Sequence, residues 1–286
     1  MENNNRNILV SETSVSNVDA AFSEALENSS SENTSTTQTT IIPPIIADNF
    51  IDESTSRFSG AIWFDKIQKQ NVLIAGVGGI GSNTAYLISR MHPNKLQLYD
   101  NDKVDNVNMS GQFFTCADLE RFKVDAIANH LQKFSHFFDT YSFRERVTEK
   151  TYLPPIVICG FDNMEARKIT FYNWLTTLEG LTEAQKKKYL FIDGRLAAEK
   201  LQVFCMTGDD TYNQDLYKRD WLFSEEEAEH AVCSYKQTSY CAMLIASIIC
   251  NLFVNFCANM CEPLINRDLP FFTEYDASTM YFKTQS

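Results

Sequence analysis

The sequence predicts an α/β fold built on a doubly wound, mostly parallel sheet with an antiparallel edge, and two observations support this prediction. Short apolar runs suited to buried strands alternate with longer segments of helical periodicity. The first apolar run, at 72–75, passes directly into a glycine-rich turn and then into a helix. This is the order expected for the first unit of a parallel sheet, whose ligands bind at the carboxyl ends of its strands.

The chain of 286 residues divides by composition into a tail and a domain. Residues 1–56 are rich in Ser, Thr, Asn and Glu and contain nine acidic side chains and one arginine, so most of the net charge of −12 lies there. Such a segment buries too little apolar surface to fold, and we expect a disordered tail, either a solvated leader or a docking arm. Residues 57–286 are expected to form one domain. The sequence has no basic field that would favour nucleic acid.

The elements of the domain follow in order from its apolar patterns. We expect strands at 72–75, 96–99, 140–147, 156–160, 189–194 and 199–206, the last of them antiparallel at the edge of the sheet. We expect helices at 57–70, 80–90, 119–134, 163–178 and 235–260, with Asp118 as the N-cap of the third. The polar stretch 207–231 is expected to be a loop. Asn251, Asn255 and Asn259 interrupt the long apolar C-terminal helix, so we expect a core or dimer helix and no membrane span.

The glycine-rich turn has the composition of a phosphate-binding loop. Glycine tolerates the positive φ angles of a tight turn and lets backbone N–H groups approach a phosphate at the start of the next helix. The four glycines are Gly76, Gly78, Gly79 and Gly81. Asp100 follows the second strand, 19 residues after Gly81, where a carboxylate would meet a ribose hydroxyl. The alternatives are a turn that only packs strand against helix and, since Asp100 also suits a dinucleotide ribose, an NAD-dependent oxidoreductase.

Further polar side chains follow the predicted strands. Asp102, Asn108 and Gln112 occupy the loop after the second strand, while Lys123 lies in the next helix. Asp162 directly follows the strand at 156–160. The carboxyl ends of parallel strands share one side of the sheet, so these groups are expected to face one ligand. The simpler explanations are a solvated helix charge for Lys123 and a helix N-cap for Asp162.

The order and spacing of these motifs resemble the ThiF, MoeB and HesA adenylyltransferases, whose Rossmann-like fold is shared with the ubiquitin-activating enzymes. The resemblance is clear over 57–206 and looser over 233–258. It rests on GVGGIGS, on LYDNDKV followed by N-x-x-x-Q, on FKVDAIANHL, and on D-N-x-x-x-R at Asp162, Asn163 and Arg167.

The resemblance implies ATP-dependent adenylylation of the C-terminal carboxylate of a ubiquitin-like or sulfur-carrier protein, or of a peptide, with ATP and Mg²⁺ as cofactors. It assigns the glycines to the phosphate turn and Asp100 to the ribose, and it places Asp102, Asn108 and Gln112 among the cofactor-binding residues. It also assigns Lys123 to the phosphates and Asp162 to Mg²⁺, an ion that takes oxygen ligands. A homodimer is implied as well.

Two glycines depart from the family pattern. The family motifs R-Y-S-R and N-L-N-R-Q read RFSG and NMSGQ here, so Gly60 and Gly111 stand where arginines would contact the phosphates. Losing two guanidinium contacts to a triphosphate weakens transition-state stabilisation unless other cations replace them. Arg195, which would then be catalytic, and Arg121 are the candidate replacements. A catalytically weakened nucleotide-binding interaction module is the alternative function.

Eight cysteines occur, and none forms a C-x-x-C pair. Most lie in apolar segments, which predicts buried thiols, a reducing cytoplasmic location and no structural zinc. No apolar stretch follows a basic start, so no signal peptide is expected. Cys233 precedes the last helix, where the family often carries a cysteine for thioester or sulfur transfer, with His230 nearby. A thiolate near a helix N-terminus is a good nucleophile, although packing is an equally open role for Cys233.

Overall fold

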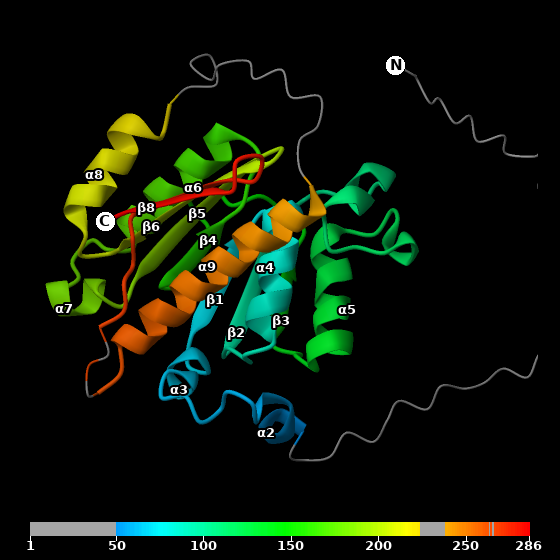
Figure 1. Ribbon diagram of the computed structural model, residues 1–286, viewed down its shortest axis with the longest axis horizontal. Coiled ribbons are helices and arrows are strands. Elements are labelled where there is room, and N and C mark those ends of the chain that lie inside the picture. The colour runs from blue at the N-terminus through cyan, green and yellow to red at the C-terminus, as the bar shows by residue number, and fades with distance from the viewer. Residues whose placement is uncertain (1–49, 224–237, 263, 265) are drawn as a thin grey trace, which may run out of the picture. The chain divides into compact units, whose positions relative to one another are not determined.

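The computed structural model describes residues 50–223, 238–262, 264 and 266–286. This part of the chain forms one eight-stranded sheet in the order β3-β2-β1-β4-β5-β6-β7-β8 (Figure 1). The first five strands pair in parallel, whereas β6, β7 and β8 add antiparallel pairs at one edge, so the predicted fold class is confirmed. The strands are β1 (Asn71–Ala75), β2 (Lys95–Tyr99), β3 (Thr140–Phe143), β4 (Ile156–Cys159), β5 (Leu190–Ala197), β6 (Lys200–Thr207), β7 (Phe272–Asp276) and β8 (Tyr281–Gln285).

Helices cover both faces of the sheet. α4 (Gly79–Ser89), α5 (Lys123–Ser135) and α9 (Ser239–Asn259) pack on one face, and α6 (Met164–Thr176) and α8 (Thr211–Asp220) pack on the other. In Figure 1, α9 crosses in front of the sheet beside α4. The short helical segments are α2 (Phe50–Thr55), α3 (Phe64–Ile67), α7 (Glu183–Lys186) and the 3₁₀ turns η2 (Asn106–Ser110) and η3 (Cys116–Asp118).

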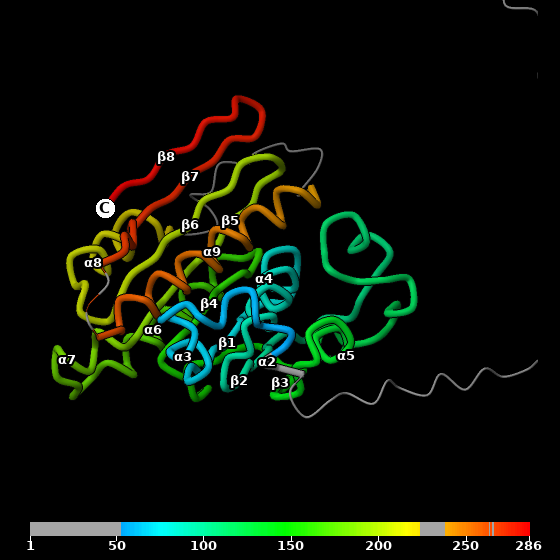
Figure 2. Tube along the Cα trace, turned by 60° about the horizontal axis from the view of Figure 1, so that its bottom comes forward, coloured from blue at the N-terminus to red at the C-terminus, as the bar shows by residue number. Residues whose placement is uncertain are grey.

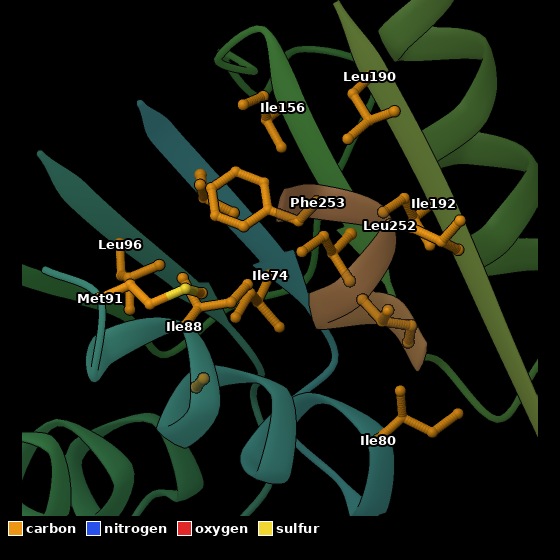
Figure 3. Close-up of a cluster of buried hydrophobic side chains, with 14 of the residues drawn as sticks. Ile74, Ile80, Ile88, Met91, Leu96, Ile156, Leu190, Ile192, Leu252 and Phe253 are labelled. Carbon is orange, nitrogen blue, oxygen red and sulfur yellow. The ribbon is translucent and has the colours of Figure 1, made fainter. Parts of the chain in front are cut away.

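The core between the sheet and α9 joins segments from the two ends of the domain (Figure 3). Alternate side chains of a strand point to opposite faces, so Ile74 of β1 packs with α4 and α9, whereas Leu73 packs with α6. Phe253 of α9 is fully buried among these side chains. Each fully buried side chain of this kind stabilises the fold by about 1.5–3 kcal/mol. The last helix therefore holds the first strand in place.

The strand register brings the carboxyl ends of four strands level. Ala75 at the end of β1 lies opposite Tyr99 at the end of β2 and Cys159 at the end of β4, and Tyr99 lies opposite Phe143 at the end of β3. The chain after β1 runs to β2 on one side of β1, while β4 lies on its other side. This reversal of strand order opens a crevice between the two connections, and open α/β sheets bind their ligands there.

α9 differs from the prediction that its asparagines leave no apolar run long enough to span a membrane. It contains an 18-residue window of mean hydropathy 2.1 and is long and apolar enough to cross a membrane by length and composition. Its asparagines do not break the helix. Asn255 Nδ2 donates to the Asp268 carbonyl (3.0 Å) and Asn259 Nδ2 to the Arg267 carbonyl (2.8 Å), so they tie the following segment to the helix. α9 also packs against α4, β5 and β6, and it is thus a core helix, one of the two roles predicted for it.

Two regions form structure where none was expected. The stretch predicted as a loop at 207–231 contains α8, whose N-cap Asp210 accepts a hydrogen bond from the Asn213 N–H (3.2 Å). The hairpin of β7 and β8 extends the sheet beyond β6, so β6 is not the edge strand (Figure 2). β8 is exposed along its length, and a strand without a buried face carries little alternation in its sequence.

Two helix predictions were wrong in their boundaries. α5 begins at Lys123 with Phe122 as its N-cap, not at 119 with Asp118. Asp118 instead ends η3, is buried, and pairs with His130 Nε2 (2.7 Å). The segment 57–70 forms turns and the four-residue α3 rather than a continuous helix.

The structure of the domain starts before residue 57. α2 lies within the segment expected to be a tail, and Thr55 is buried. Residues 1–49 lie outside the described part of the chain, so their disorder stays a prediction.

Candidate active site

The glycine turn after β1 has a conformation that only glycine provides. Gly76 adopts a φ of +84°, and a Cβ added to Gly81 would lie 1.9 Å from the Gly76 carbonyl oxygen. α4 begins directly after the turn, at Gly79, and no side chain caps it. The first N–H groups of a helix lack partners within the helix, and its N-terminus carries a partial positive charge. The turn therefore presents donors to an anion at the crevice.

Asp100 fastens this turn to the end of β2. Its carboxylate accepts hydrogen bonds from the Val77 N–H (2.8 Å) and the Asp102 N–H (2.8 Å). Burial raises the pKa of the Asp100 carboxyl, and nearby Lys123 opposes this shift. Each carboxylate oxygen has more than one acceptor site, so Asp100 retains the capacity to bind a hydroxyl group.

Lys123 lies beside these carboxylates as the first residue of α5. Its side chain is 9% exposed and its Nζ lies 3.0 Å from Asp102 Oδ2, whereas the Asp102 side chain is 58% exposed. Lys123 is therefore not a solvated helix charge. Lys123 follows Asp102 by 21 residues in the sequence, yet it forms one charged cluster with Asp100 and Asp102 at the carboxyl ends of β1 and β2.

The loop between β2 and α5 brings one amide to the glycine turn and uses another for its own structure. A Cβ added to Gly78 would lie 4.0 Å from Gln112 Nε2, so this amide faces the turn. Gln112 Oε1 is buried and has no hydrogen-bond partner within the described residues. Buried polar atoms are normally paired, which makes this oxygen a candidate ligand contact. Asn108 Oδ1 accepts a hydrogen bond from the Asp105 N–H (2.8 Å) and so stabilises η2.

Asp162 follows β4 at the crevice and has an exposed carboxylate. The only hydrogen bond to it that the described structure contains is a long one from Asn163 Nδ2 (3.4 Å). Asn163, not Asp162, caps α6, since Asn163 Oδ1 accepts a hydrogen bond from the Ala166 N–H (2.8 Å). The N-cap explanation for Asp162 is therefore wrong, and its carboxylate is free to bind a cation.

Arg167 positions the turn that carries Asp162, a role that the sequence motif did not disclose. Its side chain is 7% exposed and donates to the carbonyl groups of Phe161 and Gly194 and to the carboxylate of Asp193. Arg167 thereby ties the segment before Asp162 to β5.

Arg195, predicted as a replacement phosphate cation, lies in a buried network instead. Its guanidinium donates to Asp193 Oδ2 (2.8 Å), to the Tyr217 hydroxyl (3.2 Å) and to the Trp221 carbonyl (2.9 Å). It also covers the ring of Phe204. Burial opposes its charge, but Asp193 and Tyr217 raise the pKa of Arg195. Alternation along β5 explains this placement, because Arg195 and Asp193 face the same side, toward α8. The structure thus gives Arg195 a structural role.

The remaining cation and thiol predictions meet different outcomes. Arg121, the second predicted replacement, pairs with Asp118 (3.1 Å). Cys233 and His230 lie in 224–237, outside the described residues. Among the cysteines that the structure describes, Cys116 alone is exposed. In that same part of the chain, no group of three or more His, Cys, Asp or Glu side chains is arranged to hold a metal ion.

Comparison with known proteins decides the family. The sequence profile of the ThiF family matches residues 51–285, which is most of the chain. The chain belongs to the ThiF family. Its glycine turn, its Asp100 and its Asp162 all lie within the residues that the ThiF profile matches.

Sequence relatives of this ThiF chain include ubiquitin-like modifier-activating enzyme 5. The Drosophila sechellia enzyme is 33% identical over 123 residues, which cover 36% of this chain and 30% of the enzyme. The Bombyx mori enzyme is 42% identical over 69 residues, which cover 24% of this chain and 18% of the enzyme. The matched region therefore spans less than a third of these relatives.

Solved structures share the fold of this ThiF chain. PaaA has a TM-score of 0.62 at 12% identity, covering 96% of this chain and 83% of PaaA. Escherichia coli MccB, in a structure with ATP, has a TM-score of 0.51 at 14% identity, covering 79% of this chain and 66% of MccB. Another MccB structure contains AMPCPP and MccA, with a TM-score of 0.54 at 15% identity. At these identities the likeness shows a common fold.

Proposed function

We propose that this chain uses Mg²⁺-ATP to adenylylate the C-terminal carboxylate of a ubiquitin-like or sulfur-carrier protein, or of a peptide. One observation carries the proposal: the phosphate-type turn and the segment bearing Asp162 touch. A Cβ added to Gly76 would lie 3.0 Å from Cδ1 of Phe161, and Phe161 directly precedes Asp162, whose carboxylate is exposed. An anion site and a candidate cation ligand therefore face the same crevice. The ThiF family membership and the MccB structure with ATP support the same ligand.

The residues present fit Mg²⁺-ATP. The uncapped start of α4 and Lys123 would hold the phosphates, Asp100 the ribose, and Asp162 the Mg²⁺. Mg²⁺ is usually held by one or two carboxylates together with phosphates and water, so a single free carboxylate is adequate. When bound, ATP supplies the α-phosphate that an acceptor carboxylate attacks, with pyrophosphate leaving. The chain's own residues bind and orient the two reactants.

A nucleotide-binding module with weak or no catalysis is the second candidate, and the charge of the site favours it. Gly60 is exposed, and no atom of the described residues lies within 4 Å of an added Cβ, so nothing packs at the position of that family arginine in this part of the chain. Lys123 is paired with Asp102, and Arg195 and Arg121 are engaged elsewhere. An NAD-dependent oxidoreductase is less well supported, because NAD binding requires no free carboxylate at Asp162 to hold a metal.

The first test is thermal unfolding of the whole chain with Mg²⁺-ATP, with ATP and EDTA, and with NAD. A ligand at a hundred times its Kd stabilises the folded state by about 2.7 kcal/mol. We expect this stabilisation with Mg²⁺-ATP and its loss in Asp162→Ala. Glu165→Ala, which removes an exposed acid from the first turn of α6, is the matched control and should retain it.

Three outcomes separate the candidates. Stabilisation that needs Mg²⁺ and Asp162, together with ATP–pyrophosphate exchange when carboxylate-bearing candidate proteins are added, supports the adenylyltransferase. Stabilisation without exchange supports the binding module. Stabilisation by NAD alone, or none by any nucleotide, contradicts the proposal.

Formation of a thioester at Cys233, in which its thiolate attacks the acyl adenylate and AMP leaves, is the finer part of this proposal. Among the described thiols, burial raises the pKa of Cys159, Cys205 and Cys250 to about 12, which disfavours their nucleophilic thiolate form at neutral pH. Cys116 is exposed and must be tested beside Cys233. The homodimer and the cytoplasmic location stay predictions.

A further inference from the structure

Arg146 lies at the carboxyl ends of the parallel strands. It contacts Asn101, the residue after Asp100, which is the candidate ribose ligand. Its Nε donates to Asn101 Oδ1 (3.0 Å), and Asn101 directly follows Asp100. The Arg146 side chain is exposed, and within the described ranges no carboxylate forms an ion pair with it. One edge of its guanidinium is thus anchored, while its flat face remains available.

The order of the strands places Arg146 one step beyond the ribose position. β1, β2 and β3 lie side by side in that order (Figure 1), and neighbouring strands are about 4.8 Å apart. The phosphate turn follows β1, and Asp100 follows β2. β3 ends at Phe143, and Arg146 comes three residues later. The Phe143 carbonyl accepts a hydrogen bond from the Asp100 N–H (3.2 Å), so the ends of β2 and β3 lie side by side. A nucleotide with its phosphates at the turn and its ribose at Asp100 therefore directs its base toward Arg146.

We propose that Arg146 forms a platform for the base of the bound nucleotide, with its guanidinium plane held by Asn101 and stacked on the purine ring. This inference rests on the proposed function and adds a nucleobase-binding residue to it. A guanidinium is planar and weakly hydrated, so it stacks on aromatic rings more readily than an ammonium group does. The charge is also attracted to the face of the ring.

The neighbouring Arg144 provides a matched control. It is exposed and lies only two residues earlier, but its Nε pairs with Asp125 (2.8 Å) and its guanidinium covers the ring of Phe122 at 4.9 Å. Arg144 is therefore occupied on the α5 side of the sheet. Replacing either arginine removes one positive charge from the same segment, but only Arg146 is predicted to touch a base.

The test is calorimetric titration of the full chain and of Arg146→Ala, Arg146→Lys and Arg144→Ala with Mg²⁺-ATP and with Mg²⁺ and inorganic tripolyphosphate. We expect Arg146→Ala to weaken ATP binding about 5- to 10-fold and to leave tripolyphosphate binding unchanged. Arg146→Lys keeps the charge without the plane and should also weaken ATP binding. Arg144→Ala should bind both ligands like the unaltered chain. Since Arg146 is exposed, unchanged unfolding temperatures will confirm that each variant is folded.

Other results would overturn the inference. Equal ATP affinity in Arg146→Ala and the unaltered chain excludes a contact with the base. Equal losses for ATP and tripolyphosphate assign Arg146 to the phosphates, and an equal loss in Arg144→Ala assigns the effect to net charge. Failure of the unaltered chain to bind ATP would instead refute the proposed function, and this inference with it.

Discussion

Asp193 is a buried residue that stabilises the candidate site from within the core. This carboxylate is fully buried within β5 and accepts from Arg167, Arg195 and the Tyr217 hydroxyl (2.7 Å). Burial raises the pKa of Tyr217 well above its ordinary value, and Asp193 adds to this effect, so the hydroxyl keeps its proton and donates. One buried anion thus holds two guanidinium groups, one of which fixes the turn before Asp162.

At the residue scale, Asp193→Asn is predicted to destabilise the fold. Removing the anion leaves two buried guanidinium groups without a counter-charge, and breaking a buried ion pair in this way lowers the free energy of unfolding by about 3–5 kcal/mol. Urea unfolding measures the loss. The control is Asp215→Asn, since Asp215 is 76% exposed and pairs with Lys218 on the surface of α8. Its replacement should change the free energy by less than about 1 kcal/mol. Equal effects of the two substitutions would contradict the structural role of Asp193.

At the scale of elements, the link between η3 and α5 depends on Asp118. Its buried carboxylate accepts hydrogen bonds from the Thr115 N–H (2.9 Å) and the Thr115 hydroxyl (2.8 Å) and pairs with His130 and Arg121. Burial opposes ionisation, but the bonds from Thr115 and His130 outweigh it and lower the pKa of Asp118. The loop that carries Gln112 leads into this link, so Asp118 also positions the site.

We therefore predict that Asp118→Asn lowers the free energy of unfolding by about 2–4 kcal/mol at neutral pH. A carboxyl with a lowered folded-state pKa stabilises the fold above its ordinary pKa of 3.8. That part of the stability is lost as the pH falls through the lower folded-state value. Urea unfolding between pH 7 and pH 3 should show the difference from the unaltered chain shrinking at the acidic end.

A surface pair on α5 is the control. Asp125→Asn breaks the pair with Arg144, whose side chain is 60% exposed, and should change the free energy of unfolding by less than about 1 kcal/mol. A loss for Asp118→Asn as small as this would show that Asp118 does not hold the link.

At the scale of the whole molecule, the residues from 48 onward form a compact unit of their own. The core of this unit draws on β1, the central strands and α9. The polar composition of residues 1–49 predicts a segment that adds no apolar core of its own. We predict that a chain of residues 50–286 unfolds within about 2 °C of the full chain and retains its affinity for Mg²⁺-ATP. Thermal unfolding followed by circular dichroism measures this.

A longer truncation supplies the contrast. Removing residues 1–70 also removes Phe64 and Ile67, which are buried next to α9, and should lower the unfolding temperature by several times that amount. A large loss on removing 1–49 alone would mean that the domain includes part of the segment predicted as a tail.

Local patterns in the sequence were sufficient to predict much of the fold. β1, β2, β4 and β6 begin and end within one residue of their predicted bounds, because each is an apolar run bounded by polar, Gly or Pro residues. The glycine turn and Asp100 could be paired for the same reason, since both directly follow a strand. β8 could not be predicted, because it is exposed along its length and lacks a buried face.

The sequence by itself therefore determined the strands of the parallel part of the sheet, the glycine turn and the family, since these depend on residues that are neighbours in the chain. Only the tertiary structure decided which partner each charged side chain meets. Arg195 turns to Asp193 and α8, Lys123 to Asp102, and Arg146 to Asn101. The physical reason is that a side chain's partners are set by the packing of distant segments across the sheet. Residue type and spacing show that a charge is present, and only the assembled sheet shows what neutralises it and what it can bind.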